Sequence, residues 1–450
     1  MHDNYPLLRT CLSGKQKHVN RRDNRHAYKH YIKQMEKRSR IGDHTLVVGM
    51  DIGSEFNAAC FMDKEGNVFG RYLKIYNSRK GFDYFQTMVT QTRRKHKLTQ
   101  VLIGMEPTGH YWRKIAFFAK EKGYEVRFVR TTAVKHQREL DESSSAKSDI
   151  RDAFTIGNIV REGKYIDTVI EDGVFRQLRS LAHARERILR YIIGSTHGLQ
   201  AVLNDYFPEL KDLFWSMKAK GLWALLETYP FPEDVRNAGL PTIAALLAKT
   251  TRRKTQAHEK AQKITQAAKE SVGLKKIGKA DRARLTMYLE EIKRSDARRK
   301  ALEHQMKALL TEIPLAEYIL SLPGVGPVSC GVFLGELGNP EYFKNPRQII
   351  KYSGYDPKEN DSGSRTGRKI ISKKGRWLLR KCLYFMALQV VQRSSFFKEY
   401  YEHKKKGFVR PLEKKEALCA VILKLVRVTF ALMRDRRPFT EKMDRCQEAA

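Results

Sequence analysis

Short unbroken runs of apolar residues dominate the chain between residues 45 and 129, and turns or polar segments separate them. Runs of this length are typical of buried strands. Five of them predict strands: Leu46 to Met50, Phe56 to Met62, Val68 to Ile75, Val101 to Met105 and Tyr124 to Val129. Residues 82–89 and 110–122 have helical patterns and predict helices between the later strands.

A further helix is expected after the fifth strand, in the segment that carries Asp149 and Asp152. Taken in order, the segments predict three strands, a helix, a strand, a helix, a strand and a helix. This is the order of an RNase H-like α/β domain, which we place at residues 45–164.

Strand patterns are missing from residues 165–313, where long helical periods replace them. Residues 279–312 are highly charged and contain no glycine, and they carry apolar residues at helical spacing. We therefore expect a helical, coiled-coil spacer. Such apolar stripes are more often packing surfaces than chemical sites, so we assign them to spacing and self-association.

The spacer separates the α/β domain from a second functional domain that we expect at residues 314–440, mainly helical, with helices near 378–392 and 413–433. We expect the chain to fray after Pro438 and assign residues 441–450 to a tail. Residues 1–44 form a basic arm without a clean apolar period. A solvated tail and a nucleic-acid clamp are both open interpretations of this arm.

Charge narrows the class of partner. Lys and Arg number 86 and Asp and Glu number 50, so 86 minus 50 gives a net charge of +36. An excess this large favours a polyanion, and nucleic acid is the first choice. The six cysteines form no C-x-x-C pair, which argues against a zinc or redox site. The sequence has neither a membrane span nor a secretory signal, so we expect no membrane partner and a cytoplasmic location.

Four acids stand where an α/β domain places catalytic groups. Asp51 ends the first predicted strand, Glu106 ends the fourth, and Asp149 and Asp152 share one face of a helix. Each alone could be an ordinary turn or helix-start residue. Together they would repel one another unless divalent cations neutralise them, and Mg²⁺ (or Mn²⁺) suits carboxylate oxygens. The set predicts metal-dependent phosphodiester chemistry.

Two segments of the second domain have the composition of phosphate-binding loops. Leu322 to Pro327 resembles the hairpin of a helix-hairpin-helix motif, with Gly324 and Gly326 allowing backbone N–H groups to approach a phosphate. Residues 360–376 combine small hydroxyl residues with six cations: Arg365, Arg368, Lys369, Lys373, Lys374 and Arg376. A plain interhelical turn and a polar linker would look similar, and composition alone selects no nucleophile here.

The motifs together resemble one family, the DEDD-type insertion-sequence transposases, also described as bridge-RNA-guided recombinases, which include the Piv-type DNA invertases. The resemblance runs from about Thr45 to Phe439. Its blocks are Gly49 to Gly53, Met105 to Tyr111, Lys147 to Ala153, Leu322 to Pro327, Asp361 to Gly363, Ile371 to Gly375 and Leu378 to Arg380.

This resemblance implies that Asp51, Glu106, Asp149 and Asp152 are the metal-binding tetrad of a RuvC-like domain. It also implies that Ser362 is the nucleophile of a transposase domain, forming a phosphoserine–DNA intermediate; chemically, Ser364 is a local rival. The implied partners are donor and target DNA, a noncoding guide RNA from the element and further copies of the chain, as a dimer or tetramer. A bacterial or archaeal, nucleoid-associated protein would follow.

The basic arm is longer than the few residues usual in this family, and the helical spacer is longer than in its compact members. Both differences bear on RNA fit and assembly more than on chemistry. Two other functions are open. A RuvC-like endonuclease or junction resolvase would need the four acids but no Ser362. A nucleic-acid-binding architectural protein would need neither, although intact acids at all four positions argue against it.

Overall fold

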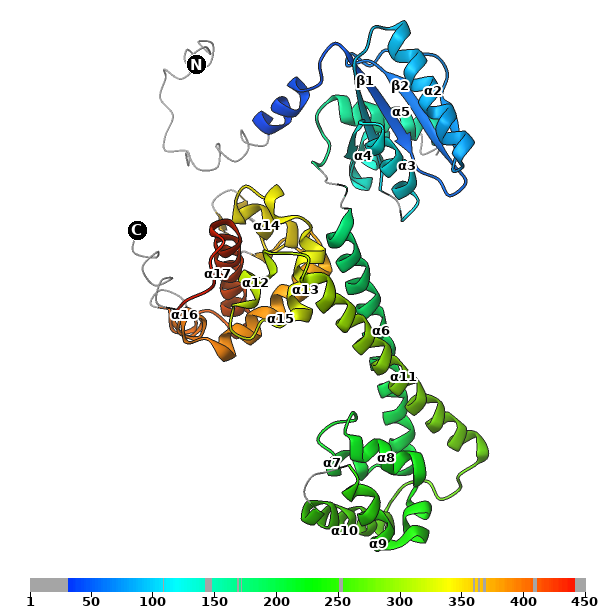
Figure 1. The fold of residues 1–450 in the computed structure, drawn as a ribbon, viewed down its shortest axis with the longest axis vertical. Helices are drawn as coiled ribbons and strands as arrows, with labels where there is room; N and C mark the ends of the chain where they lie inside the picture. The colour runs from blue at the N-terminus through cyan, green and yellow to red at the C-terminus, as the bar shows by residue number, and fades with distance from the viewer. Residues whose placement is uncertain are drawn as a thin grey trace. The chain divides into compact units, whose positions relative to one another are not determined.

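The computed structural model describes residues 31–107, 109–141, 148–167, 170, 172–250, 254–358, 361–362, 365–366, 370–407 and 411–441. The chain divides into two compact units, Met1–Ile170 (unit 1) and Glu171–Ala450 (unit 2), as Figure 1 shows. The finer domain boundaries expected from the sequence stay predictions. Among the described helices, none has the length and apolar character needed to cross a membrane.

Unit 1 is built on a mixed five-stranded sheet in the order β3-β2-β1-β4-β5. Its strands are β1 (Thr45–Asp51), β2 (Phe56–Met62), β3 (Leu73–Tyr76), β4 (Gln100–Met105) and β5 (Glu125–Phe128). β1 pairs antiparallel with β2 and parallel with β4. This sheet confirms the α/β class and fits an RNase H-like domain.

The prediction of the third strand is wrong over the first half of its range. We expected Val68 to Ile75, but regular pairing begins at Leu73, and Val68 makes only an isolated bridge to Met62. Gly70, with φ of 77°, turns the chain between the two. A glycine with positive φ interrupts an extended run without steric cost, so apolar composition alone could not place this break.

Helices cover both faces of the sheet. Apolar residues of α2 (Arg79–Lys95) and α3 (Trp112–Glu121) share one core cluster with Leu46, Val48 and Met50 of β1. α4 (Thr131–Asp141) and α5 (Asp149–Arg161) share the other with Val47. Because side chains alternate along a strand, odd-numbered residues of β1 face α5.

Part of the predicted basic arm is attached to unit 1. Residues 31–39 form a helix, while residues 1–30 lie outside the described part of the chain. Lys37 is 9% exposed, and its ammonium donates a hydrogen bond to the Tyr165 carbonyl at 2.7 Å and pairs with Asp167 at 2.9 Å. Burial lowers the pKa of Lys37, and Asp167 opposes that shift. Lys37 therefore ties the arm to the end of the α/β domain.

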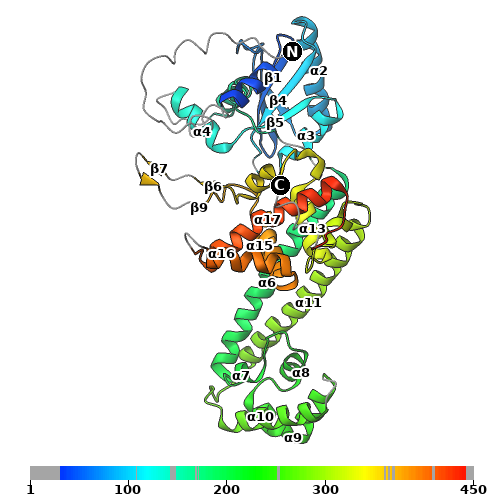
Figure 2. The same cartoon turned by 90° about the vertical axis from the view of Figure 1, so that its left-hand side faces the viewer.

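Unit 2 contains two long antiparallel helices, α6 (Gly173–Tyr206) and α11 (Lys279–Leu310), which lie side by side (Figures 1 and 2). Gly198, late in α6, meets Tyr288, early in α11, and Arg185 pairs with Glu303 at 2.7 Å. The pairing of these helices is observed, whereas their winding as a coiled coil stays a prediction.

A folded helical head joins the far ends of this pair, where the sequence predicted only spacer. It has its own hydrophobic core, which includes Phe207, Phe231 and Ile264. Its helices are α7 (Leu210–Leu213), α8 (Lys220–Thr228), α9 (Pro232–Ala248) and α10 (Lys254–Glu270).

The rest of unit 2 is mainly helical, as expected. Its helices are α12 (Ala316–Leu320), α13 (Pro327–Leu337), the 3-10 turn Pro340–Tyr342, α14 (Pro346–Ser353), α15 (Trp377–Arg393), α16 (Ser395–Lys406) and α17 (Lys414–Asp435). Four two-residue strands interrupt them: β6 (Pro357–Lys358), β7 (Asp361–Ser362), β8 (Arg365–Thr366) and β9 (Ile370–Ile371).

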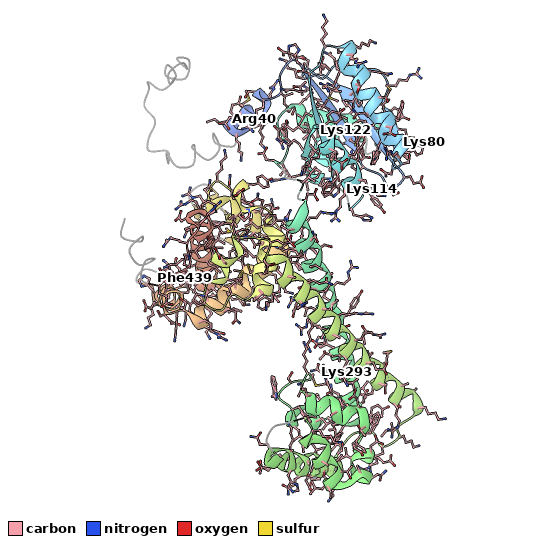
Figure 3. All side chains as sticks on the ribbon, in the orientation of Figure 1. Arg40, Lys80, Lys114, Lys122, Lys293 and Phe439 are labelled. Atoms are coloured by element: carbon pink, nitrogen blue, oxygen red, sulfur yellow. The ribbon has the colours of Figure 1, made fainter. Side chains whose placement is uncertain are left out.

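The expectation of fraying after Pro438 is wrong for the next three residues. The Phe439 ring stacks on Phe397 with centroids 5.9 Å apart, and Figure 3 shows Phe439 beside the C-terminal helices. The Glu441 carboxylate accepts hydrogen bonds from Ser394 and Ser395 at the start of α16. An aromatic anchor followed by a helix cap holds this end, and residues 442–450 lie outside the described chain.

Candidate active site

Two of the predicted acids lie next to each other at the carboxyl ends of parallel strands. Met50 of β1 is paired with Met105 of β4, so Asp51 and Glu106, one residue further on, are neighbours across the sheet. Two residues earlier, Gly49 and Gly104 face α5. Since side chains alternate along a strand, Asp51 and Glu106 are directed to that same face.

The other two acids lie in the first turn of α5, which packs on this face. The packing is close because Gly49 has no side chain: an added Cβ would lie 2.0 Å from the Ala153 carbonyl oxygen and 2.4 Å from the Gly157 nitrogen. A Cβ on Gly104 would lie 2.2 Å from a methyl group of Val160. The two strand glycines thus allow α5 to bring Asp149 and Asp152 to the strand ends.

Replacing Gly49 by alanine is expected to destabilise unit 1 by about 3 kcal/mol or more, because the new methyl group meets backbone atoms that cannot move aside. Chemical denaturation of the full chain measures the change. Gly42→Ala is the matched control, since a Cβ there meets nothing within 4 Å. Equal stability of the two variants would show that α5 is not held by this contact.

One cavity of about 610 Å³ collects the four acids. Asp51, Glu106, Asp149 and Asp152 all line it, together with the loop Ile52 to Phe56 and three residues of α4. The loop is held by buried Asn57, which accepts a hydrogen bond from the Gly53 amide at 3.3 Å and donates one to Asn77 at 2.9 Å. The predicted carboxylates therefore share one water-accessible space.

The pKa of Asp51 reflects both the burial of this carboxyl group and the charges of the other three acids. It is raised from 3.8 to about 6, first by burial and then by the neighbouring charges of Asp152, Asp149 and Glu106. An acid held among three other acids prefers to keep its proton, and a bound cation would remove that preference. Asp152 is the most enclosed of the four, with 4% of its surface exposed.

The donor set suits a hard divalent cation, because all four groups supply carboxylate oxygens. Within the described residues, however, no three Asp, Glu, His or Cys side chains are drawn together into a ready-made ligand cluster. A cationic side chain lies in the cavity instead: Arg138 Nε of α4 is 3.0 Å from Asp152 Oδ1. The four carboxylates are the oxygen ligands that Mg²⁺ and Mn²⁺ prefer, and they line one space.

The candidate residues of unit 2 fall in two places. Gly324, with φ of 84°, packs against Arg393 and Gln389 of α15, and Gly326 caps the start of α13. The Arg376 guanidinium donates to the Glu336 carbonyl at 2.6 Å, near the end of that helix. These two contacts lie at opposite ends of α13. Since an α-helix rises about 1.5 Å per residue, they are roughly 15 Å apart. The two segments are therefore separate in space, as they are in the sequence, and their contact with nucleic acid stays a prediction.

Ser362 lies near the tip of a hairpin. β7 pairs with β8 through Ser362 and Arg365, and β6 pairs with β9 behind them. Figure 2 shows β7 standing away from the helices of this part of unit 2. Ser364, Arg368 and Lys369 lie outside the described residues, and of Ser362 and Arg365 only the backbone is described.

The root of this hairpin is held tightly. The Arg380 guanidinium donates to the carbonyls of Ser353 and Lys373, both at 3.1 Å, and the Ser372 hydroxyl hydrogen-bonds the Asp356 carboxylate. A Cβ on Gly375 would lie 2.5 Å from the Tyr352 carbonyl oxygen. Lys373 and Lys374 therefore lie on a fixed base from which the hairpin extends.

Sequence reasoning missed the wall of the cavity that α4 supplies. Thr131, Lys135 and Arg138 line it from this helix. Their spacing of four and three residues places them on one helical face, which is the only signal the sequence offers. Nothing in the segment between the fifth strand and the acidic helix marks that face as part of a site.

A mixed five-stranded β-sheet flanked by helices, with acids at its strand ends, fits the RNase H-like domain of the DEDD class of transposases. Two family models match the chain. One, described as a transposase of the DEDD IS110 type, matches residues 48–208, and the other, described as the transposase IS116/IS110/IS902 family, matches residues 316–402. The chain belongs to the IS110/IS116 family of transposases and is a DNA transposase.

Relatives agree with this assignment. The chain is 26% identical to an insertion element IS116 protein of Streptomyces clavuligerus, over 65% of this chain and 73% of that one. It is 22% identical to an insertion element IS110 protein of Streptomyces coelicolor, over 72% and 80%. A pilin gene-inverting protein of Moraxella lacunata is 28% identical over 32% of this chain and 45% of its own length. These results confirm the resemblance found in the sequence.

Proposed function

We propose that this transposase cuts and rejoins DNA with Asp51, Glu106, Asp149 and Asp152 as ligands of Mg²⁺ or Mn²⁺. The observation that carries the proposal is the convergence of these four acids on one cavity at the ends of parallel strands. A bound ion of this kind would neutralise the scissile phosphate and the charge that develops on the reacting oxygens. The protein's own part is to hold four carboxylates around one space.

Ser362 is the proposed nucleophile. In that step the Ser362 hydroxyl loses its proton as its Oγ bonds to the phosphorus. The bond from phosphorus to one deoxyribose oxygen breaks, and this leaving oxygen takes up a proton. Support comes from the place of Ser362 near the tip of a hairpin whose root is rigid. A fixed base with an extended tip suits a side chain that must reach a DNA backbone.

Donor and target DNA are the proposed substrates, and a noncoding RNA from the element is the proposed guide. The net charge of +36 supports phosphate-rich partners. Base pairing by an RNA would supply target choice, which agrees with many basic residues and no evident base-reading module.

A dimer or tetramer is proposed as the working form, with the helical spacer wound as a coiled coil. Gly324 and Gly326 are proposed to contact DNA through a helix-hairpin-helix motif.

The test is a trapping assay on the full chain. Protein, flanking noncoding RNA and cognate DNA are mixed with Mg²⁺ or with EDTA, then denatured and examined for DNA attached to protein. We expect an adduct that needs Mg²⁺. Free nicked DNA without an adduct would favour a RuvC-like endonuclease or resolvase, and binding without cleavage in any condition would favour an architectural protein.

A further inference from the structure

Arg138 lies in the same cavity as the four acids, beside the most buried of them. Its Nε is 3.0 Å from Asp152 Oδ1, and the two side chains are 22% and 5% exposed. Enclosing a carboxylate among other carboxylates is costly unless a cation compensates it. The guanidinium supplies such a charge from α4, the helix that packs beside α5.

Lys135 shows that this placement is particular to Arg138. Both residues belong to α4 and line the cavity. The Lys135 side chain is 75% exposed, however, and its ammonium approaches Glu139 of its own helix at 3.8 Å. Arg138 therefore pairs with one of the four acids, whereas Lys135 remains at the edge of the cavity.

We propose that Arg138 is a built-in counter-ion of Asp152, which a metal ion must displace and which a DNA phosphate then binds. The inference rests on the proposed metal site. An ion and a guanidinium compete for the same carboxylate oxygens, so the pair weakens metal binding in the absence of DNA. A phosphate that takes the guanidinium in two parallel hydrogen bonds leaves Asp152 open to the metal.

This exchange couples two ligands. If DNA removes Arg138 from Asp152, DNA raises the affinity for metal, and metal raises the affinity for DNA by the same factor. The transposase would then hold its metal loosely until a substrate backbone enters the cavity. The same pair disfavours metal loading, and with it cleavage, until DNA of the correct geometry is bound.

The test measures metal binding rather than cleavage. Free Mn²⁺ is followed by electron paramagnetic resonance as it is titrated into the full chain, with and without a short DNA duplex. For Arg138→Gln we expect Mn²⁺ to bind about fivefold tighter or more without DNA, and the gain from adding DNA to shrink by a similar factor. Arg138→Lys keeps the charge but not the planar fork, so it is expected to fall between.

Lys135→Gln is the matched control, because it removes one positive charge from the same helix and cavity but not the pair. A large gain in Mn²⁺ affinity in Lys135→Gln as well would show a general field effect and overturn the inference. Unchanged affinity in a folded Arg138→Gln would reduce the pair to a structural link between α4 and α5. If the unaltered chain takes up no Mn²⁺, with or without DNA, the proposed metal site itself fails.

Discussion

Ser362→Ala is expected to lower covalent adduct formation and strand rejoining by at least about a thousandfold, because no other atom replaces the attacking oxygen. DNA binding and the free energy of unfolding should stay close to their original values, since the residue lies near the tip of the hairpin. Denaturing electrophoresis of labelled DNA measures the adduct, and a mobility shift in EDTA measures binding.

Ser364→Ala is the control for this result, because Ser364 is the neighbouring hydroxyl that composition alone could not exclude. We expect it to leave the adduct largely intact. If the adduct survives Ser362→Ala and disappears in Ser364→Ala, the nucleophile is reassigned within the same hairpin. Cleavage that persists at full rate in both variants without an adduct would remove the serine step and leave a metal-dependent nuclease.

Much of unit 1 follows from local patterns. The runs that end at Met50 and Met105 are buried strands, and acids placed immediately after such runs stand on the sheet edge. A further signal lay in the sequence. Gly-Met-Asp at Gly49 and Gly-Met-Glu at Gly104 repeat a glycine two positions before each acid, on the face that receives α5. Because side chains alternate along a strand, the acid two residues after each glycine is directed to the face on which α5 packs.

The features that the sequence did not reveal depend on contacts between residues far apart in the chain. Arg138 and Asp152 meet across two helices, and nothing in the period of α4 specifies which acid its cations reach. The helical head was missed for a similar reason. Its core depends on residues as distant as Phe207 and Ile264, whereas apolar spacing in each short helix predicts only a helix. Local periodicity identifies elements, and tertiary contacts decide which residues converge.

Asp51→Asn is expected to separate stability from activity. The raised pKa of Asp51, about 6, means that the folded chain holds this proton more tightly than the unfolded chain. The free energy of unfolding of the metal-free protein therefore falls as pH rises from about 4 to about 6. Asparagine carries no charge. Allowing for solvent screening of this partly exposed side chain, we expect the variant to be about 2 kcal/mol more stable at pH 8 in EDTA and close to unchanged at pH 4.

The same substitution removes a proposed metal ligand, so Mn²⁺ binding and DNA cleavage should fall by about a hundredfold or more. Denaturant titrations at the two pH values and a Mn²⁺ titration check both parts. Glu55→Gln is the control, because Glu55 lines the same cavity without belonging to the four acids. If Asp51→Asn binds Mn²⁺ normally, Asp51 is no ligand. If it is less stable at pH 8, the burial of a charged Asp51 and its repulsion by the other acids do not govern the stability of this site.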